Sequence, residues 1–245
     1  MMIDYSHPCM LALRQFGQKL GVLRPMVRAY RRVLGKAYEE NFDIRMLDLV
    51  RTGQIVWDIG ANIGVFTVKF SDAVGPSGRV LAFEPAPNTF NTLKRQIVGR
   101  KNVKGVNAAL ADFSGKATFA LSDDANDPTN SLLKSAPDQG SYSGSVAVDV
   151  FRAQDYVKNH PDDFPNFIKV DVEGFEDDVI KGAGDMLRDS RLQVVCVEVH
   201  FLELAKRGRT SGATYIADAL RSAGFKVAWT DPSHIVATRI RHQTS

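Results

Sequence analysis

Residues 55–64 have the sequence IVWDIGANIG, a short apolar run that ends in a glycine-rich turn. Five residues rich in β-branched and aromatic side chains, bounded by glycine, predict a buried strand. Gly60 and Gly64 permit the backbone angles that a tight turn requires. The apolar stretch from Val65 to Val74, closed by Gly75-Pro76, predicts a helix after the turn. The segment therefore predicts a strand–turn–helix unit whose turn can present bare backbone N–H groups to a ligand.

The same alternation of strand and helix continues along the chain. Further strands are predicted at about 80–83, 103–110, 167–171 and 194–199, with helices through 90–97, 176–187 and 213–221. Buried strands that alternate with amphipathic helices imply a parallel sheet covered on both faces. The last two strands, 225–229 and 234–238, are joined by only four residues, so they must be antiparallel. The predicted class is α/β, with a mostly parallel sheet that ends in an antiparallel hairpin.

The middle of the chain departs from this pattern. Strands are predicted at 117–121 and 145–151, on either side of a polar stretch from Ser122 to Gly144. A polar stretch of this length in a compact domain is commonly functional or mobile, so we expect it to lie near the substrate.

Composition narrows the class of protein. The 245 residues are 44% hydrophobic and 24% charged, with a net charge of +3, which is typical of a globular domain and does not require a nucleic-acid partner. Cys9 and Cys196 cannot form a disulfide framework or a zinc site, which favours a reduced, cytoplasmic location. No apolar run reaches the roughly 20 residues of a membrane-spanning helix, and no signal-peptide cleavage pattern is present.

The first 37 residues form a separate region in this prediction. Their helical, arginine-rich pattern predicts a basic cap over residues 1–37, ahead of a main domain over 38–245. We expect the cap to pack on the core with its arginines in solvent. Contact with an anionic substrate or peripheral contact with a membrane is the alternative.

The turn differs from a dinucleotide-binding turn. Its spacing is Gly-x-Asn-x-Gly, with Asn62 where a dinucleotide site needs glycine, and Asp58 would repel a diphosphate but suits an ammonium group. Glu84 ends the second strand, where an acid can accept hydrogen bonds from both ribose hydroxyls. Asp112, after the third strand, could reach an adenine amino group, although Asp112-Phe-Ser-Gly115 is also an ordinary turn.

Five motifs resemble those of class I S-adenosylmethionine-dependent methyltransferases, and more narrowly of the FkbM family. They are DIGANIG (58–64), FEP (83–85), NAALAD (107–112), IKVDVEGFE (168–176) and VE (197–198). The resemblance covers roughly residues 38–240 and implies a Rossmann-like, seven-stranded sheet with S-adenosylmethionine as cofactor. The cofactor-binding residues implied are Asp58, Gly60, Ala61, Asn62, Gly64, Glu84, Pro85, Asp112 and Asp171.

Charged residues also gather where later strands end. Asp171, Glu173, Glu198 and His200 are the candidate catalytic residues. His200 suits a general base, because its ordinary pKa is about 6.5; alternatively Asp171, Glu198 and His200 bind one divalent metal ion. Glu176 belongs either to this site or to the favoured acidic first turn of a helix. The remaining histidines are predicted to be surface residues without companions: His7, His160, His234 and His242.

We therefore predict transfer of a methyl group to a hydroxyl of a small molecule, which by the family resemblance is a sugar, a glycolipid or a polyketide-type metabolite. A nicotinamide-dependent oxidoreductase is disfavoured by Asn62 and by the terminal hairpin. A nucleic-acid methyltransferase is disfavoured because the basic N-terminal segment lacks interleaved aromatic residues for base stacking. A binding module without catalysis is disfavoured by the charged residues at the strand ends.

Overall fold

The computed structural model describes residues 7, 10, 42–121, 131–133 and 144–240. The predicted basic cap, 1–37, lies outside them apart from His7 and Met10, and so does most of the polar stretch 122–144. The cap, its boundary with the main domain and its contacts remain predictions.

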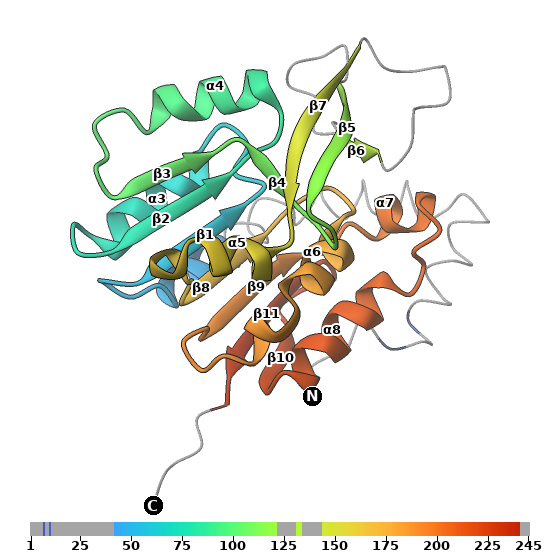
Figure 1. Ribbon diagram of the computed structural model, residues 1–245. Coiled ribbons are helices and arrows are strands. Elements are labelled where there is room, and N and C mark those ends of the chain that lie inside the picture. The colour runs from blue at the N-terminus through green and yellow to red at the C-terminus, as the bar shows by residue number, and fades with distance from the viewer. Residues whose placement is uncertain (1–6, 8–9, 11–41, 122–130, 134–143, 241–245) are drawn as a thin grey trace, which may run out of the picture.

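One large sheet organises the chain. Its seven strands run in the order β10-β11-β9-β8-β1-β2-β3, and β11 is antiparallel to both of its neighbours (Figure 1). The strands are β1 (Ile55–Ile59), β2 (Arg79–Phe83), β3 (Val103–Val106), β8 (Phe167–Val170), β9 (Val194–Glu198), β10 (Phe225–Trp229) and β11 (His234–Arg239). This topology confirms the predicted Rossmann-like class I methyltransferase fold with its antiparallel C-terminal hairpin.

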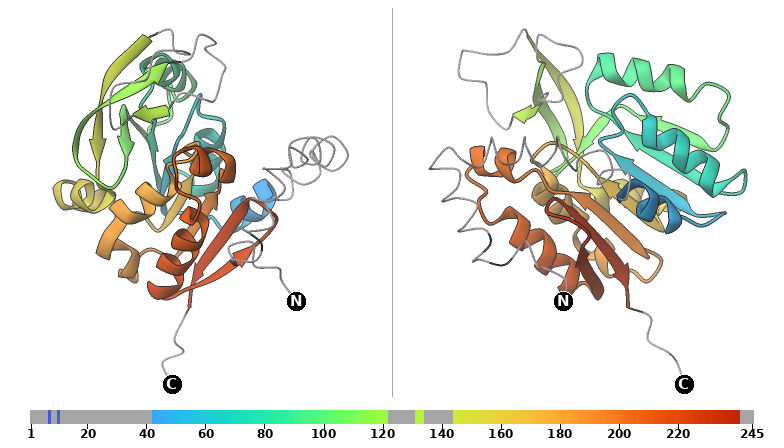
Figure 2. Two further views of the ribbon diagram at one scale, coloured as in Figure 1. Left: turned by 90° about the vertical axis from the view of Figure 1, so that its right-hand side faces the viewer. Right: turned by 180° about the vertical axis from the view of Figure 1, so that it is seen from behind.

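Helices cover both faces of this sheet (Figure 2). They are α3 (Val65–Val74), α4 (Pro87–Gln96), α5 (Ala153–Asn159), α6 (Glu176–Ala183), α7 (Phe201–Lys206), α8 (Gly212–Ser222), helical residues 42–48, and the 3₁₀ turns Pro161–Asp163 and Gly184–Arg188. Because side chains alternate along a strand, Val56 of β1 belongs to the same core cluster as Phe70 of α3, whereas Trp57 belongs to the cluster on the other face with Ile180 and Ile216. The first face, covered by α3 and residues 42–48, is called the α3 face below.

The predicted third strand, 103–110, is wrong as a single element. It breaks at Asn107, whose side-chain amide donates hydrogen bonds to the carbonyl oxygens of Glu84 at 2.8 Å and Pro85 at 3.0 Å. β3 stays beside β2, and the continuation, β4 (Ala108–Leu110), joins a second sheet in the order β4-β7-β5-β6. Its other strands are β5 (Gly115–Leu121), β6 (Ser131–Leu133) and β7 (Gly144–Phe151). The predicted strands 117–121 and 145–151 are thus confirmed, but the sheet they build was not predicted.

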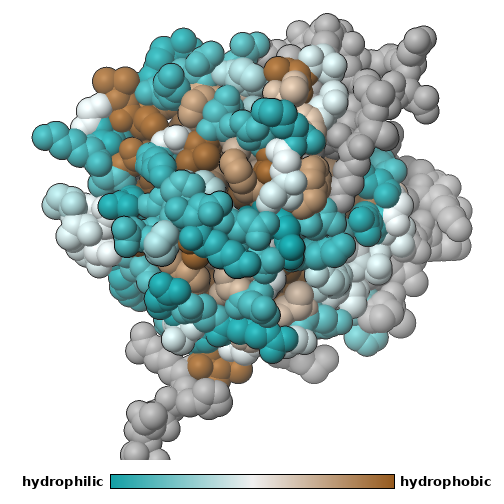
Figure 3. Space-filling model, in the orientation of Figure 1, coloured by the Kyte–Doolittle hydropathy of each residue, from teal (hydrophilic) through white to brown (hydrophobic). Residues whose placement is uncertain are grey.

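The predicted helix 176–187 is shorter than expected, because α6 ends at Ala183 and Gly184, with a φ of 52°, begins a 3₁₀ turn. Figure 3 shows a mostly hydrophilic face with its hydrophobic side chains in small groups, which is normal for a folded domain. Among the described residues, no helix has the length and hydropathy needed to cross a bilayer.

Candidate functional site

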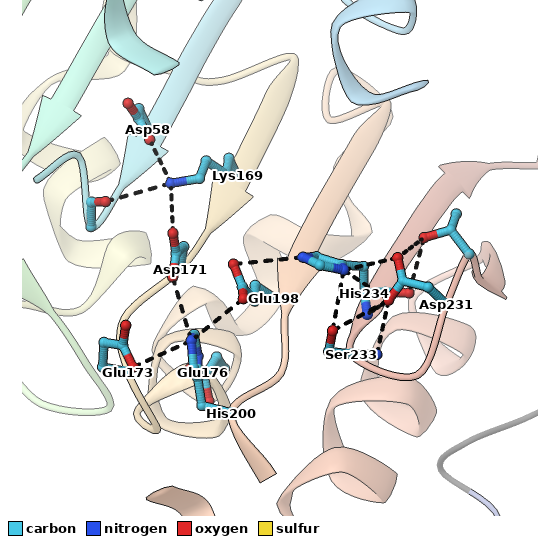
Figure 4. A network of polar contacts seen from close by, with 12 residues as sticks. Asp58, Lys169, Asp171, Glu173, Glu176, Glu198, His200, Asp231, Ser233 and His234 are labelled. Atoms are coloured by element: carbon cyan, nitrogen blue, oxygen red, sulfur yellow. Dashed lines mark hydrogen bonds and ion pairs between the residues drawn. The ribbon is translucent and has the colours of Figure 1, made fainter. Parts of the chain in front are cut away.

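Four neighbouring strands carry a charged or titratable residue on the α3 face near one edge of the sheet. They are Asp58 on β1, Lys169 on β8, Glu198 on β9 and His234 on β11 (Figure 4). Side chains alternate between the two faces along each strand. The residue just before each charged residue on β1, β8 and β9 therefore belongs to the core on the face opposite the α3 face. The period of the strands therefore brings four polar side chains into one layer beneath the helices.

Lys169 is the centre of a buried ion pair. Its ammonium lies 3.3 Å from Asp58 Oδ1 and 3.2 Å from Asp171 Oδ2, and only 5% of the residue is exposed. Burial alone would lower the pKa of Lys169, but the two carboxylates outweigh burial and raise it above its usual value. Asp58 is wholly buried, and its other oxygen accepts a 2.6 Å hydrogen bond from Thr67. The ammonium that Asp58 meets here is thus the chain's own, and a contact with a cofactor remains a prediction.

Glu84 organises the glycine-rich turn. Its carboxylate accepts hydrogen bonds from the backbone N–H of Asn62 at 3.0 Å and of Ala86 at 2.9 Å. Burial raises the pKa of Glu84 to about 7, against those two hydrogen bonds. Gly60 must be glycine, because its φ is 76° and a Cβ there would lie 1.8 Å from the carbonyl oxygen of Asp171. The predicted cofactor residues of β1 and β2 are therefore brought together, with Asn62 exposed at the tip of the turn.

His200 stands among carboxylates beyond the ends of β8 and β9 (Figure 4). Its Nδ1 lies 2.8 Å from Glu176 Oε1; its Nε2 lies 3.3 Å from Glu173, 3.7 Å from Glu198 and 3.8 Å from Asp171. Burial would lower the pKa of His200, but the hydrogen bond to Glu176 and the other carboxylates raise it to about 10. The surrounding carboxylates thus favour the protonated ring, and the predicted roles of His200 as general base or metal ligand remain predictions.

Glu176 contacts His200 and also lies in the acidic first turn of α6, so its two predicted positions coincide. The residue is wholly buried, and its Oε1 accepts a 2.7 Å hydrogen bond from the backbone N–H of Gly174 as well as contacting His200. Gly174 has a φ of 94°, and a Cβ there would come within 2.5 Å of the Glu203 Cβ. The turn after β8 is thus held tightly enough to fix the orientation of the His200 ring.

The prediction that His234 is an isolated surface residue is wrong. His234 is 5% exposed, its Nδ1 lies 2.8 Å from Asp231, and its Nε2 lies 3.6 Å from Glu198 Oε2. Its ring also stacks on Phe42 at 3.9 Å. The cause is the hairpin register, which sets His234 directly opposite Glu198. The sequence predicts the hairpin and a strand that ends in glutamate, but it does not supply the register that pairs the two residues.

The other predicted residues occupy separate positions. His7 and His160 are exposed, as predicted, and His242 lies outside the described residues. The prediction that His160 has no companion is wrong, because its ring stacks on Tyr156 with 4.3 Å between the ring centroids. Asp112 follows β4 and is 3.1 Å from the Lys181 ammonium, so its predicted contact with adenine stays a prediction.

A cavity of about 290 Å³ adjoins the charged layer on the α3 face. It is lined by Phe42, Asp43, Phe66, Lys169, Val170, Glu198 and His234. A second cavity of about 490 Å³, which includes Arg79, Lys104 and Asp163, lies where β2 and β3 begin and contains none of the predicted site residues. Of these two cavities, the smaller one shares residues with the site.

Comparison with known proteins gives one family. A model described as "Methyltransferase FkbM domain" matches residues 58–227, which include every predicted catalytic and cofactor-binding residue but not His234. A hexuronic acid methyltransferase, AglP, of Haloferax volcanii is 30% identical over 63% of this chain and 59% of its own length. "Methyltransferase 1" of Beauveria bassiana is 36% identical over 52% of this chain and 57% of its own length.

A third relative, the 31-O-demethyl-FK506 methyltransferase FkbM of Streptomyces tacrolimicus, is 27% identical over 62% of this chain and 67% of its own length. The matched part of the chain thus spans less than two thirds of the length of the first two relatives.

Proposed function

The chain belongs to the FkbM methyltransferase family, and on this premise we propose that it is an S-adenosylmethionine-dependent O-methyltransferase that acts on a hydroxyl group of a small molecule. One observation carries the proposal: the turn at 60–64 and the carboxylates around His200 adjoin each other at one edge of the sheet. Lys169 connects them, because its ammonium contacts Asp171 and lies 3.5 Å from the Gly60 carbonyl oxygen. The family assignment displaces the nicotinamide-dependent alternative.

The residues of the turn suit the methyl donor. Each carboxylate oxygen of Glu84 accepts one backbone hydrogen bond, so each oxygen keeps a lone pair that can accept a hydrogen bond from a ribose hydroxyl. Carboxylates that outnumber the nearby cations favour a positively charged sulfonium over a diphosphate. The turn at 60–64, Glu84, Pro85 and Asp112 would hold the donor, which supplies a methyl group on a positive sulfur.

The acceptor hydroxyl must lose its proton, and a divalent cation is the candidate that suits the site better than a histidine base. Asp171, Glu198 and His200 each offer one ligand atom, all within 4.8 Å of one another. A metal-binding histidine usually donates its other ring N–H to a carboxylate. Glu176 is such a partner for Nδ1 of His200, and Nε2 is left facing the carboxylates. A cation there would lower the pKa of the acceptor hydroxyl.

The relatives support the acceptor class. The names of two of them contain a hexuronic acid and FK506, so a hydroxyl on a sugar or a polyketide-type molecule is the proposed acceptor. We propose no nucleic-acid partner, and a cytoplasmic location because the two cysteines cannot form a disulfide framework.

Thermal unfolding with added ligands tests the donor. S-adenosylhomocysteine at 100 times its dissociation constant should add about 2.7 kcal/mol of stability, which raises Tm by roughly 5–11 °C for a chain of this size. NAD and NADP should leave Tm unchanged. A response to NAD without one to S-adenosylhomocysteine contradicts the proposal, and strong, salt-dependent RNA binding would favour a nucleic-acid methyltransferase instead.

Binding of Mn²⁺ tests the cation independently of turnover. Electron paramagnetic resonance of the protein saturated with S-adenosylhomocysteine should show bound Mn²⁺, which His200→Ala weakens by roughly ten-fold or more. The control variant His160→Ala removes an exposed histidine that is not one of the proposed metal ligands, so it should leave Mn²⁺ affinity unchanged. Equal Mn²⁺ affinity in wild type and His200→Ala contradicts the proposed metal ligands.

A further inference from the structure

The cavity on the α3 face is joined to the site by residues that the two share. Phe42, from residues 42–48, and Phe66 of α3 form its apolar wall, and Glu198 lies on the sheet side with Lys169 and His234. One oxygen of Glu198 is 3.7 Å from His200 Nε2, and the other is 3.6 Å from His234 Nε2. A molecule in the cavity therefore touches the carboxylate that adjoins His200.

Each of the four charged or titratable side chains in the cavity lining faces a group of opposite charge. The ammonium of Lys169 is already met by Asp58 and Asp171, so its positive charge is compensated before a ligand arrives. Burial would lower the pKa of His234, but the carboxylates of Asp231 and Glu198, which face its two ring nitrogens, raise it to about 9. Asp43 lies 3.5 Å from the Lys69 ammonium, and Glu198 faces His200 and His234, so a charge brought by a ligand would meet groups that are already compensated. The carboxylate oxygens can still accept hydrogen bonds from hydroxyl groups.

The wall and the size point to a single ring. Phe42 and Phe66 offer aromatic carbon, against which the C–H groups of a sugar ring pack. About 290 Å³ is at the small end of the range for ligand pockets, which suits one ring and excludes a large polycyclic body. Apolar walls with carboxylate acceptors match a group that has C–H faces and a rim of hydroxyls.

We propose that this cavity binds one neutral, hydroxyl-rich sugar ring of the methyl acceptor and presents its hydroxyl to the Glu198 side of the site. The inference rests on the proposed methyltransferase function, since it names the acceptor of the same site. It places Phe42, Asp43 and Phe66 in acceptor recognition, and it predicts that a ring bearing a carboxylate is disfavoured.

Saturation-transfer NMR on the full chain, saturated with S-adenosylhomocysteine, tests the inference directly. The probes are the methyl α-glycosides of glucose, galactose and mannose, with glucuronic acid and cyclohexanol as charged and apolar counterparts. At least one neutral glycoside should bind, and glucuronic acid should bind more weakly than that glycoside. Binding of glucuronic acid as tight as that of any glycoside, or binding of cyclohexanol alone, overturns the inference.

Paired variants tie the binding to this cavity. Phe66→Leu should weaken the best glycoside by roughly three- to ten-fold, and Phe151→Leu, outside the cavity, should not. Asp43→Asn, a partly exposed position, should weaken it as well, unlike the exposed Asp72→Asn on α3. Glycoside affinity unchanged in both cavity variants overturns the inference.

Two further results separate this inference from the proposed function. S-adenosylhomocysteine that displaces the glycoside assigns the cavity to the donor and overturns the inference alone. A chain that neither binds S-adenosylhomocysteine nor transfers methyl groups overturns the proposed function as well. The thermal unfolding measurement described above distinguishes these two failures.

Discussion

Replacement of Lys169 by methionine tests whether its buried ion pair with Asp58 and Asp171 stabilises the fold. The ammonium is 3.3 Å from Asp58 and 3.2 Å from Asp171, and Asp58 is wholly buried. Lys169→Met leaves Asp58 with a hydrogen bond from the Thr67 hydroxyl but without its cation, and an uncompensated buried charge costs about 3–5 kcal/mol. Each 1 kcal/mol shifts Tm by roughly 2–4 °C in a chain of this size, so Tm should fall by roughly 6–20 °C.

Scanning calorimetry measures this loss of stability. Two further variants show whether the loss comes from the unpaired charge of Asp58. Asp58→Asn/Lys169→Met removes both charges and should be more stable than Lys169→Met alone, because no buried carboxylate is left unpaired at Asp58. Lys116→Met breaks an exposed ion pair with Asp149 and should cost less than about 1 kcal/mol. A double variant less stable than Lys169→Met, or equal losses for Lys169→Met and Lys116→Met, would refute the reasoning.

Three other predictions concern single residues. Glu84→Gln should weaken S-adenosylhomocysteine binding by about 1.5–3 kcal/mol in calorimetry at pH 8. Because burial raises the pKa of Glu84 to about 7, wild-type affinity should also fall below pH 7, and the variant's should not. His200→Ala removes a proposed metal ligand, so it should lower turnover by about 100-fold, with S-adenosylhomocysteine affinity within about two-fold of wild type. Against burial, Lys104 and Arg79 lower the pKa of Asp163, so its carboxylate stabilises the fold above about pH 4 and this contribution is lost at lower pH. Asp163→Asn should therefore lower Tm at pH 7 but much less at pH 3; an equal loss at both pH values contradicts this linkage.

The parts of the fold that glycine and proline delimit could be predicted from the sequence. β1, α3 and the hairpin have boundaries within about one residue of those expected, because their ends are set by local turn chemistry. The break at Asn107 could not be predicted, because its cause is not local. The Asn107 side chain binds carbonyl groups at the end of β2, and β4 pairs with a strand far along the chain.

The site was predictable to the extent that strand ends reveal it. Asp171, Glu198 and His200 follow apolar runs, so their convergence at one sheet edge could be expected. Glu176 has two explanations in sequence, since an acid is favoured in any first helical turn. His234 needs the register of β11 against β9, which no local pattern supplies. Contacts made across strands are thus the part that required the structure.

The strand order explains why these particular residues form one network. From β1 the chain first builds β2 and β3 on one side and later returns to build β8 and β9 on the other, so β1 and β8 flank the point where the order reverses. Ligands of open α/β sheets bind in the crevice at that point. Asp58 and Lys169 are direct neighbours across it, and Lys169 reaches Gly60 on the donor side and Asp171 on the side of His200.

Loss of that ammonium should therefore impair both halves of the site together. Lys169 contacts the turn that would hold the donor and also lines the cavity assigned to the acceptor. A residue that served only the donor half would change S-adenosylhomocysteine affinity alone, whereas Lys169→Met should weaken both this affinity and glycoside binding. Because the variant is also less stable, both affinities are measured well below its Tm. The double variant, with Asp58 neutralised, should recover stability without recovering either affinity, since the ammonium that joins the two halves is still missing.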